Sequence, residues 1–161
     1  MTPPHASQPS QAPEPAHARQ SPAGGATAAA CGADIRLHLV AGHMGEIPVP
    51  AQLTYTQGDP YAVRLHCLTS PTTTVTWVLD RASLRSGLRG VSGLGDVVIS
   101  PGPGTGSVSI TLGNGPGAAL LRAEAEEIRG FLRLTEHVVP YGAEGRHLDI
   151  DALIARLRAA P

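Results

Sequence analysis

Apolar and polar residues alternate along the middle of the chain, starting at Asp34. A period of two residues is typical of a β-strand that buries one face. Four such runs follow one another with short turns between them, which favours an antiparallel meander. Their expected core positions are Ile35, Leu37 and Leu39, then Ile47, Val49, Ala51, Leu53 and Tyr55, then Tyr61, Val63, Leu65 and Cys67, and finally Val75, Trp77 and Leu79.

Proline and glycine positions refine this picture. Pro48 and Pro50 remove hydrogen-bond donors from the second run, so at least its first half should lie at an edge of the sheet. A second set of strands is expected to begin at residues 97–99, turn through the Gly- and Pro-rich residues 101–106, and return through residues 108–112. Residues 118–121 could form a last strand or the start of a helix, and the pattern leaves both open.

Helical signals occupy the remaining segments. Asp80 can cap a short helix that reaches Leu84 and ends near Gly87, where a residue tolerant of positive φ would stop it. A longer helix should start at the acidic residues Glu124, Glu126 and Glu127 and end at residues 139–140. Gly130 interrupts it and should cost about 1 kcal/mol of stability relative to Ala. Its buried face is predicted to contain Ile128, Phe131, Leu132 and Thr135.

The last predicted helix follows Asp149, which can cap it. Its apolar residues recur with the 3.6-residue period of an amphipathic helix. They are Ile150, Leu153, Ile154 and Leu157. We call these four residues the C-terminal stripe, and we expect either the domain's own sheet or a neighbouring subunit to cover it.

These elements predict one α+β domain over residues 34–161, with a strongly bent antiparallel sheet or sheets and helices at its C-terminal end. Residues 1–33 are rich in Pro, Ala, Ser and Gln and hold almost no large apolar side chains. Such a segment cannot bury enough surface to offset its chain entropy, so we expect a disordered tail there.

Composition narrows the setting. The formal net charge is -1, which gives the chain no overall attraction to nucleic acid or anionic lipid. The chain has no Lys, and its abundant Ala, Gly and Pro have GC-rich codons, which points to an actinobacterium. Neither a membrane-spanning run nor a secretory signal is recognisable, so we expect a cytoplasmic protein. Cys31 and Cys67 are isolated and should be reduced thiols.

Possible catalytic and metal motifs each have a simpler explanation. The glycine-rich residues 102–106 lack the Lys and Ser/Thr of a phosphate-binding loop and read as a hairpin turn. His147, Asp149 and Asp151 lie close together as metal ligands would, but acids are expected at the start of a helix. No GxSxG elbow or paired-histidine motif is present. We therefore predict no catalytic residue, no cofactor and no metal, and a protein that is not an enzyme.

Arginines form the strongest remaining pattern. Arg81, Arg85 and Arg89 recur every four residues, so at least the first two could share one helical face. Nucleic-acid sites usually add stacking aromatic residues to such a cluster, and aromatic residues are scarce here. A solvated or subunit-facing basic patch is therefore the favoured interpretation.

Several segments together resemble the SsgA-like proteins, a family of actinobacterial regulators of sporulation-specific cell division. Each segment alone is weakly specific, but their order and spacing extend through residues 34–157. The segments are VPAQLTY at 49–55, DPYAV at 59–63, VTWV at 75–78, RASLRSGL at 81–88, GDV at 95–97, ALLRA at 119–123, FLRLT at 131–135, VP at 139–140, and the helix near Asp149 and Asp151.

The resemblance implies a fold similar to that of the "whirly" single-stranded-nucleic-acid-binding proteins, a homotrimer, no enzymatic activity, and a place at the division septum. It implies partners such as the tubulin-like division protein FtsZ or other SsgA-like proteins. Our leading hypothesis is a non-enzymatic regulator that positions division or septal wall machinery through protein–protein contacts. The alternative is a single-stranded-nucleic-acid-binding protein. The candidate interaction surface is Arg81, Arg85, Arg89 and the C-terminal stripe.

Overall fold

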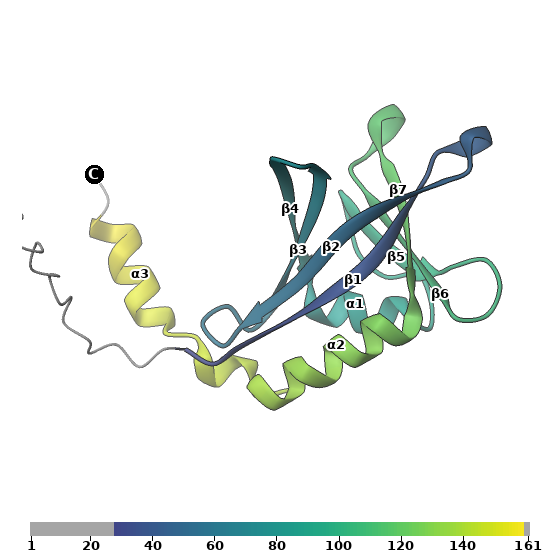
Figure 1. Ribbon diagram of the computed structural model, residues 1–161. Coiled ribbons are helices and arrows are strands. Elements are labelled where there is room, and N and C mark those ends of the chain that lie inside the picture. Colours follow the sequence, from purple (N-terminus) through teal and green to yellow (C-terminus); the bar gives the residue numbers. More distant parts are fainter. Residues whose placement is uncertain (1–27, 160–161) are drawn as a thin grey trace, which may run out of the picture.

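The computed structural model describes residues 28–159, which fold around a curled, seven-stranded antiparallel sheet with the strand order β4-β3-β2-β1-β7-β6-β5 (Figure 1). The strands are β1 (Ala30–Val40), β2 (Glu46–Thr56), β3 (Ala62–Ser70), β4 (Thr73–Asp80), β5 (Val97–Pro101), β6 (Ser107–Leu112) and β7 (Ala119–Glu124). The helices are α1 (Arg81–Gly87), α2 (Ala125–Val138) and α3 (Ile150–Ala159). Single 3-10 turns occur at η1 (Gly42–Met44), η2 (Gly115–Gly117) and η3 (Glu144–His147).

The predicted α+β class, bent antiparallel sheet and C-terminal helices are confirmed. Strands β1 to β4 form the expected meander, and β5 to β7 join it through the pairing of β7 with β1. The strand β1 begins at Ala30, so residues 30–33 pair within the sheet and do not belong to the predicted tail. Residues 1–27 of that tail lie outside the described residues.

The first half of β2 lies at an open edge, as its prolines predict. Residues 46–56 pair with β1 along their whole length, whereas pairing with β3 starts only at Ala51. The β1–β2 and β3–β4 hairpins therefore separate beyond that residue (Figure 1). Three positions expected in the core, Ile47, Tyr61 and Val75, are exposed because they lie near strand ends.

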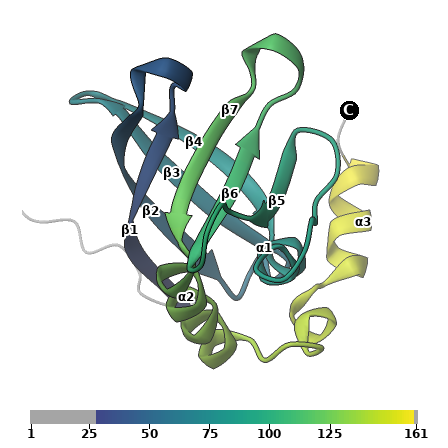
Figure 2. The same ribbon diagram turned by 90° about the vertical axis from the view of Figure 1, so that its right-hand side faces the viewer.

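The segment that the pattern left open is strand β7. Its residues pair with β6 along the whole of β7, and residues 121–123 also pair with β1. It therefore joins the two halves of the sheet, which face each other across the core with α1 and α2 at one end (Figure 2). The predicted inner face of α2 is confirmed: Ile128, Phe131, Leu132 and Thr135 are all buried.

Gly87 is the last residue of α1, but a positive φ is not what requires glycine there. Its φ is not positive, but a Cβ atom there would lie 2.2 Å from the Cγ2 atom of Ile99. Ile99 is fully buried in β5. Glycine at this position therefore allows α1 and β5 to pack closely together.

The substitution Gly87→Ala should consequently destabilise the domain by about 1–3 kcal/mol, because the added methyl group overpacks the contact with Ile99. Urea unfolding followed by circular dichroism measures the change. Gly90→Ala is the matched control, since a Cβ atom there meets nothing within 4 Å. Equal stability of the two variants would contradict the close packing of α1 on β5.

The C-terminal stripe is not covered by the domain's own sheet. Ile150, Ile154 and Leu157 are 52%, 39% and 70% exposed, and α3 stands apart from the strands (Figure 1). The fourth member, Leu153, belongs to α3, but its side chain lies outside what the structure describes. Among residues 28–159, no helix is long and apolar enough to cross a membrane.

Candidate interaction site

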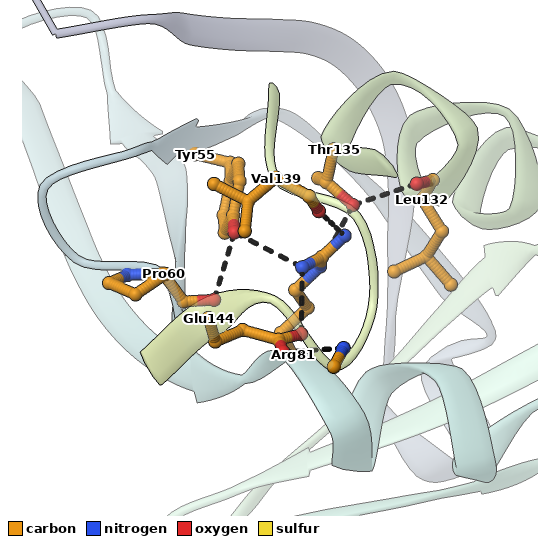
Figure 3. Close-up of polar contacts among 8 residues, drawn as sticks. Tyr55, Pro60, Arg81, Leu132, Thr135, Val139 and Glu144 are labelled. Carbon is orange, nitrogen blue, oxygen red and sulfur yellow. Dashed lines mark hydrogen bonds and ion pairs between the residues drawn. The ribbon is translucent and has the colours of Figure 1, made fainter. Parts of the chain in front are cut away.

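Arg81 is the centre of a buried polar network. Asp80 caps α1 by accepting a hydrogen bond from the backbone N–H of Ser83, and this places Arg81 in the first turn, where it is 1% exposed. Its guanidinium donates four hydrogen bonds (Figure 3). The acceptors are Thr135 Oγ1 at 3.1 Å, Tyr55 Oη at 3.1 Å, Glu144 Oε1 at 3.0 Å and the Val139 carbonyl at 2.7 Å.

The partners of Arg81 are themselves satisfied. The Tyr55 hydroxyl donates to the Pro60 carbonyl at 2.9 Å, and the Thr135 hydroxyl donates to the Leu132 carbonyl at 2.7 Å. The second carboxylate oxygen of Glu144 accepts from the backbone N–H of Gly142 at 2.6 Å. Burial raises the pKa of the Tyr55 phenol, with Arg81 opposing the shift, so the hydroxyl stays a donor at neutral pH.

The network corrects the prediction that Arg81 belongs to an exposed interaction surface. Arg81 precedes the buried Leu84 by three residues, so it shares the inward face of α1. Its guanidinium is tolerated there because a carboxylate and several oxygen atoms pair with it. The partners come from β2, the end of α2 and η3, and spacing within one helix could not reveal them.

Arg85 and Arg89 are exposed, as predicted, and they line a groove of about 410 Å³ between α1 and α2. We call it the arginine groove. The sequence reasoning missed the arginines on α2. The residues that line the groove are Arg85, Leu88, Arg89, Arg129, Leu132, Arg133, Glu136 and Tyr141.

The arginines of the groove differ in the groups that they contact. Glu126 accepts from Arg133 at 2.9 Å and from Arg129 at 3.4 Å, and these two hydrogen bonds lower the pKa of its carboxyl group. Arg85 instead stacks on the Tyr141 ring, with its guanidinium carbon 4.3 Å from the ring centroid. Arg81 stacks on the same ring at 3.9 Å, which connects the groove to the buried network.

A second, larger hollow lies over β1, β2 and β3. It has a volume of about 890 Å³, and its polar lining includes Arg36, Gln52 and His66. His66 hydrogen bonds Thr54 at 3.0 Å and Thr76 at 2.9 Å across the strands, while Arg36 pairs with Glu127 of α2 at 3.3 Å. These contacts connect strand to strand and strand to helix, so His66 and Arg36 have structural partners within the domain.

The remaining candidates for chemistry are metal-ligating side chains and the two cysteine thiols. Within residues 28–159, no three His, Cys, Asp or Glu side chains lie together in a way that could hold a metal ion. Asp149 and Asp151 lie at the start of α3, where the sequence predicted a helix terminus. Cys31 and Cys67 are both free, and burial raises the pKa of each thiol, which disfavours the nucleophilic thiolate.

Comparisons with known proteins identify the class to which this fold belongs. The chain matches the profile of the family described as Streptomyces sporulation and cell division protein, SsgA, over residues 49–144. The chain belongs to this family. The matched segment contains the whole Arg81 network and the residues of the arginine groove.

Individual relatives are similar over most of the folded region. The chain is 40% identical over 128 residues to the sporulation-specific cell division protein SsgB of Streptomyces coelicolor, which covers 78% of this chain and 93% of the relative. It is 41% identical over 128 residues to SsgB of Kineococcus radiotolerans, with 77% of each chain covered. The predicted role in sporulation and cell division, in an actinobacterial family, is thereby confirmed.

Solved structures agree. One comes from a study of SsgB mutations that correlate to longitudinal cell division during sporulation of Streptomyces coelicolor. It has a TM-score of 0.73 and 38% identity, and the match covers 78% of this chain and 100% of the other. The SsgA-like sporulation-specific cell division protein of Thermobifida fusca has a TM-score of 0.73 and 31% identity, over 82% of this chain and 98% of the other.

Proposed function

We propose that the protein is a non-enzymatic regulator of sporulation-specific cell division that positions division or septal wall machinery through protein–protein contacts. The similarity to SsgB proteins over most of residues 28–159 carries the proposal. The buried Arg81 is engaged in structural pairs, whereas the notable exposed features are an apolar helix face and a basic groove. Exposed features of these kinds suit binding to other proteins.

Two kinds of partner follow from this proposal. Further copies of the chain would cover the C-terminal stripe in the homotrimer that the resemblance to SsgA-like proteins implies, with closed cyclic symmetry. Division proteins such as FtsZ, or other SsgA-like proteins, would bind the assembled surface at the division septum. The arginine groove and the stripe lie on different elements, so we expect self-association and partner binding to use separate residues.

Gene replacement in the host tests the proposed function. We expect deletion to reduce or misplace sporulation septa, and we expect a fluorescent fusion of the protein to localise at those septa. Reintroduction of the wild-type gene should restore both. Normal sporulation septa in the deletion strain, together with a fusion spread evenly through the cell, would contradict the proposal.

A further inference from the structure

We infer that the arginine groove between α1 and α2 binds a short acidic segment of a partner protein that carries an apolar side chain between its carboxylates. This inference rests on the proposed function, because it names the chemistry of one partner in a protein–protein contact. The groove lies outside the C-terminal stripe and has features that a solvated surface does not require.

Its charge is the first such feature. Four arginines line the groove, Arg85, Arg89, Arg129 and Arg133, against a single lining carboxylate, Glu136. Arg129 and Arg133 share Glu126, and in the part of the chain that the structure describes no ion pair joins Arg85 or Arg89 to a carboxylate. Arginines on and just after α1 and arginines on α2 therefore concentrate positive charge in one hollow, and an acidic ligand would relieve the repulsion among these four side chains.

The type of cation also matters. A guanidinium presents a planar set of donors that fits a carboxylate with two parallel hydrogen bonds. Four such groups on both walls of a hollow can engage several carboxylates of an extended segment. The groove accordingly favours Asp and Glu side chains in succession over a single small anion.

Apolar side chains form the remainder of the groove. Leu132 is buried, Leu88 is half-buried, and both line the hollow together with the ring of Tyr141. A ligand consisting only of charged groups would leave this apolar lining without a partner. An aliphatic side chain flanked by acids would fill it, and burial of that side chain would contribute to affinity.

The groove is also held in a fixed shape. Arg81 begins α1 and hydrogen bonds Thr135 and the Val139 carbonyl at the end of α2, so the network joins the two helices that form the walls. Tyr141 is placed by stacking on Arg81 and Arg85. A preorganised site loses less conformational entropy when it binds a ligand, which suits recognition of a flexible segment.

Nucleic acid is the less suitable occupant. Sites for single strands combine cations with aromatic rings that are free to stack on bases. Tyr141 is the aromatic residue that lines this groove, and two guanidinium groups already stack on its ring.

Fluorescence anisotropy with the full-length protein tests the inference. The probe is a fluorescein-labelled peptide of alternating Glu and Leu, and a labelled oligothymidine of similar charge is titrated in parallel. We expect the peptide to bind in a salt-dependent manner. Arg85→Ser/Arg89→Ser and, on the facing helix, Arg129→Ser/Arg133→Ser should each weaken binding by at least about tenfold.

The matched control is Arg36→Ser/Arg64→Ser, which removes two arginines outside the groove and should change peptide affinity by less than about twofold. Circular dichroism confirms that each variant is folded. Equal loss in the control would show attraction by net charge alone, and tighter binding of oligothymidine at the same arginines would make the groove a nucleic-acid site. Either result overturns the inference, as does a wild-type protein that restores septation but does not bind the peptide.

Discussion

Replacing Arg81 by Met should reduce the free energy of unfolding by about 3–5 kcal/mol. The guanidinium is fully enclosed, and its removal leaves the Glu144 carboxylate, whose side chain is 11% exposed, without its cationic partner. The Val139 carbonyl would lose its charged donor as well. An uncompensated buried charge is far more destabilising than the loss of an exposed ion pair. Urea denaturation followed by circular dichroism measures the effect.

A double substitution separates the ion pair from its surroundings. Arg81→Met/Glu144→Leu removes both charges, so it should recover part of the stability that Arg81→Met loses. Arg85→Met, one helical turn further along α1, is the control and should cost no more than about 1 kcal/mol, because this side chain is exposed and its identified contact is stacking on Tyr141. Equal losses for Arg81→Met and Arg85→Met would show that the buried network contributes little.

The substitution Ile154→Asp should weaken self-association of the protein by at least about 100-fold, and Ile154→Asp/Leu157→Asp should leave it a monomer. In the proposed homotrimer the exposed part of each apolar side chain is buried once per protomer, so the effect of one substitution is repeated in every copy. A carboxylate placed at that contact would also have to be dehydrated. Light scattering over a range of protein concentrations gives the mass directly.

The matched control for this experiment is Ala155→Asp, which introduces the same charge on the opposite, exposed face of α3. It should leave the mass unchanged. Ile154→Asp and Ala155→Asp should each keep the unfolding free energy of the monomeric domain, because Ile154 and Ala155 are exposed in the single chain. A wild-type protein that remains monomeric at all concentrations, or equal dissociation by Ala155→Asp, would contradict the role of the C-terminal stripe.

Local sequence patterns predicted most elements of the fold because strands and helices each impose their own residue period on buried positions. Alternation around Ile35 and Leu53 reflects the period of a strand, and the face of Ile128 and Phe131 reflects the period of a helix. The assignment of residues 118–121 could not be made in this way. That segment is a strand because β6 and β1 lie on either side of it, and the order of strands in a sheet is a long-range property.

The candidate site was predictable only in part, for the same reason. Spacing placed Arg81 and Arg85 on one helix, but it could not show that the first is buried and the second exposed. The partner Glu144 is 63 residues away, and Arg129 and Arg133 belong to a helix whose position relative to α1 follows from the whole fold. Similarly, the need for glycine at position 87 depends on Ile99 in another element.

The open half of β2 limits how partners can approach this domain. Pro48 and Pro50 are two residues apart and therefore face the same edge of the strand, and unbroken pairing with β1 places that edge on the side that β3 leaves open. An incoming strand would find no N–H groups at those two positions to continue the ladder. This stretch of β2 is thus protected against the addition of a strand from another chain, and a partner that binds there would have to be recognised by side chains, which can be selective in a way that a bare backbone edge cannot.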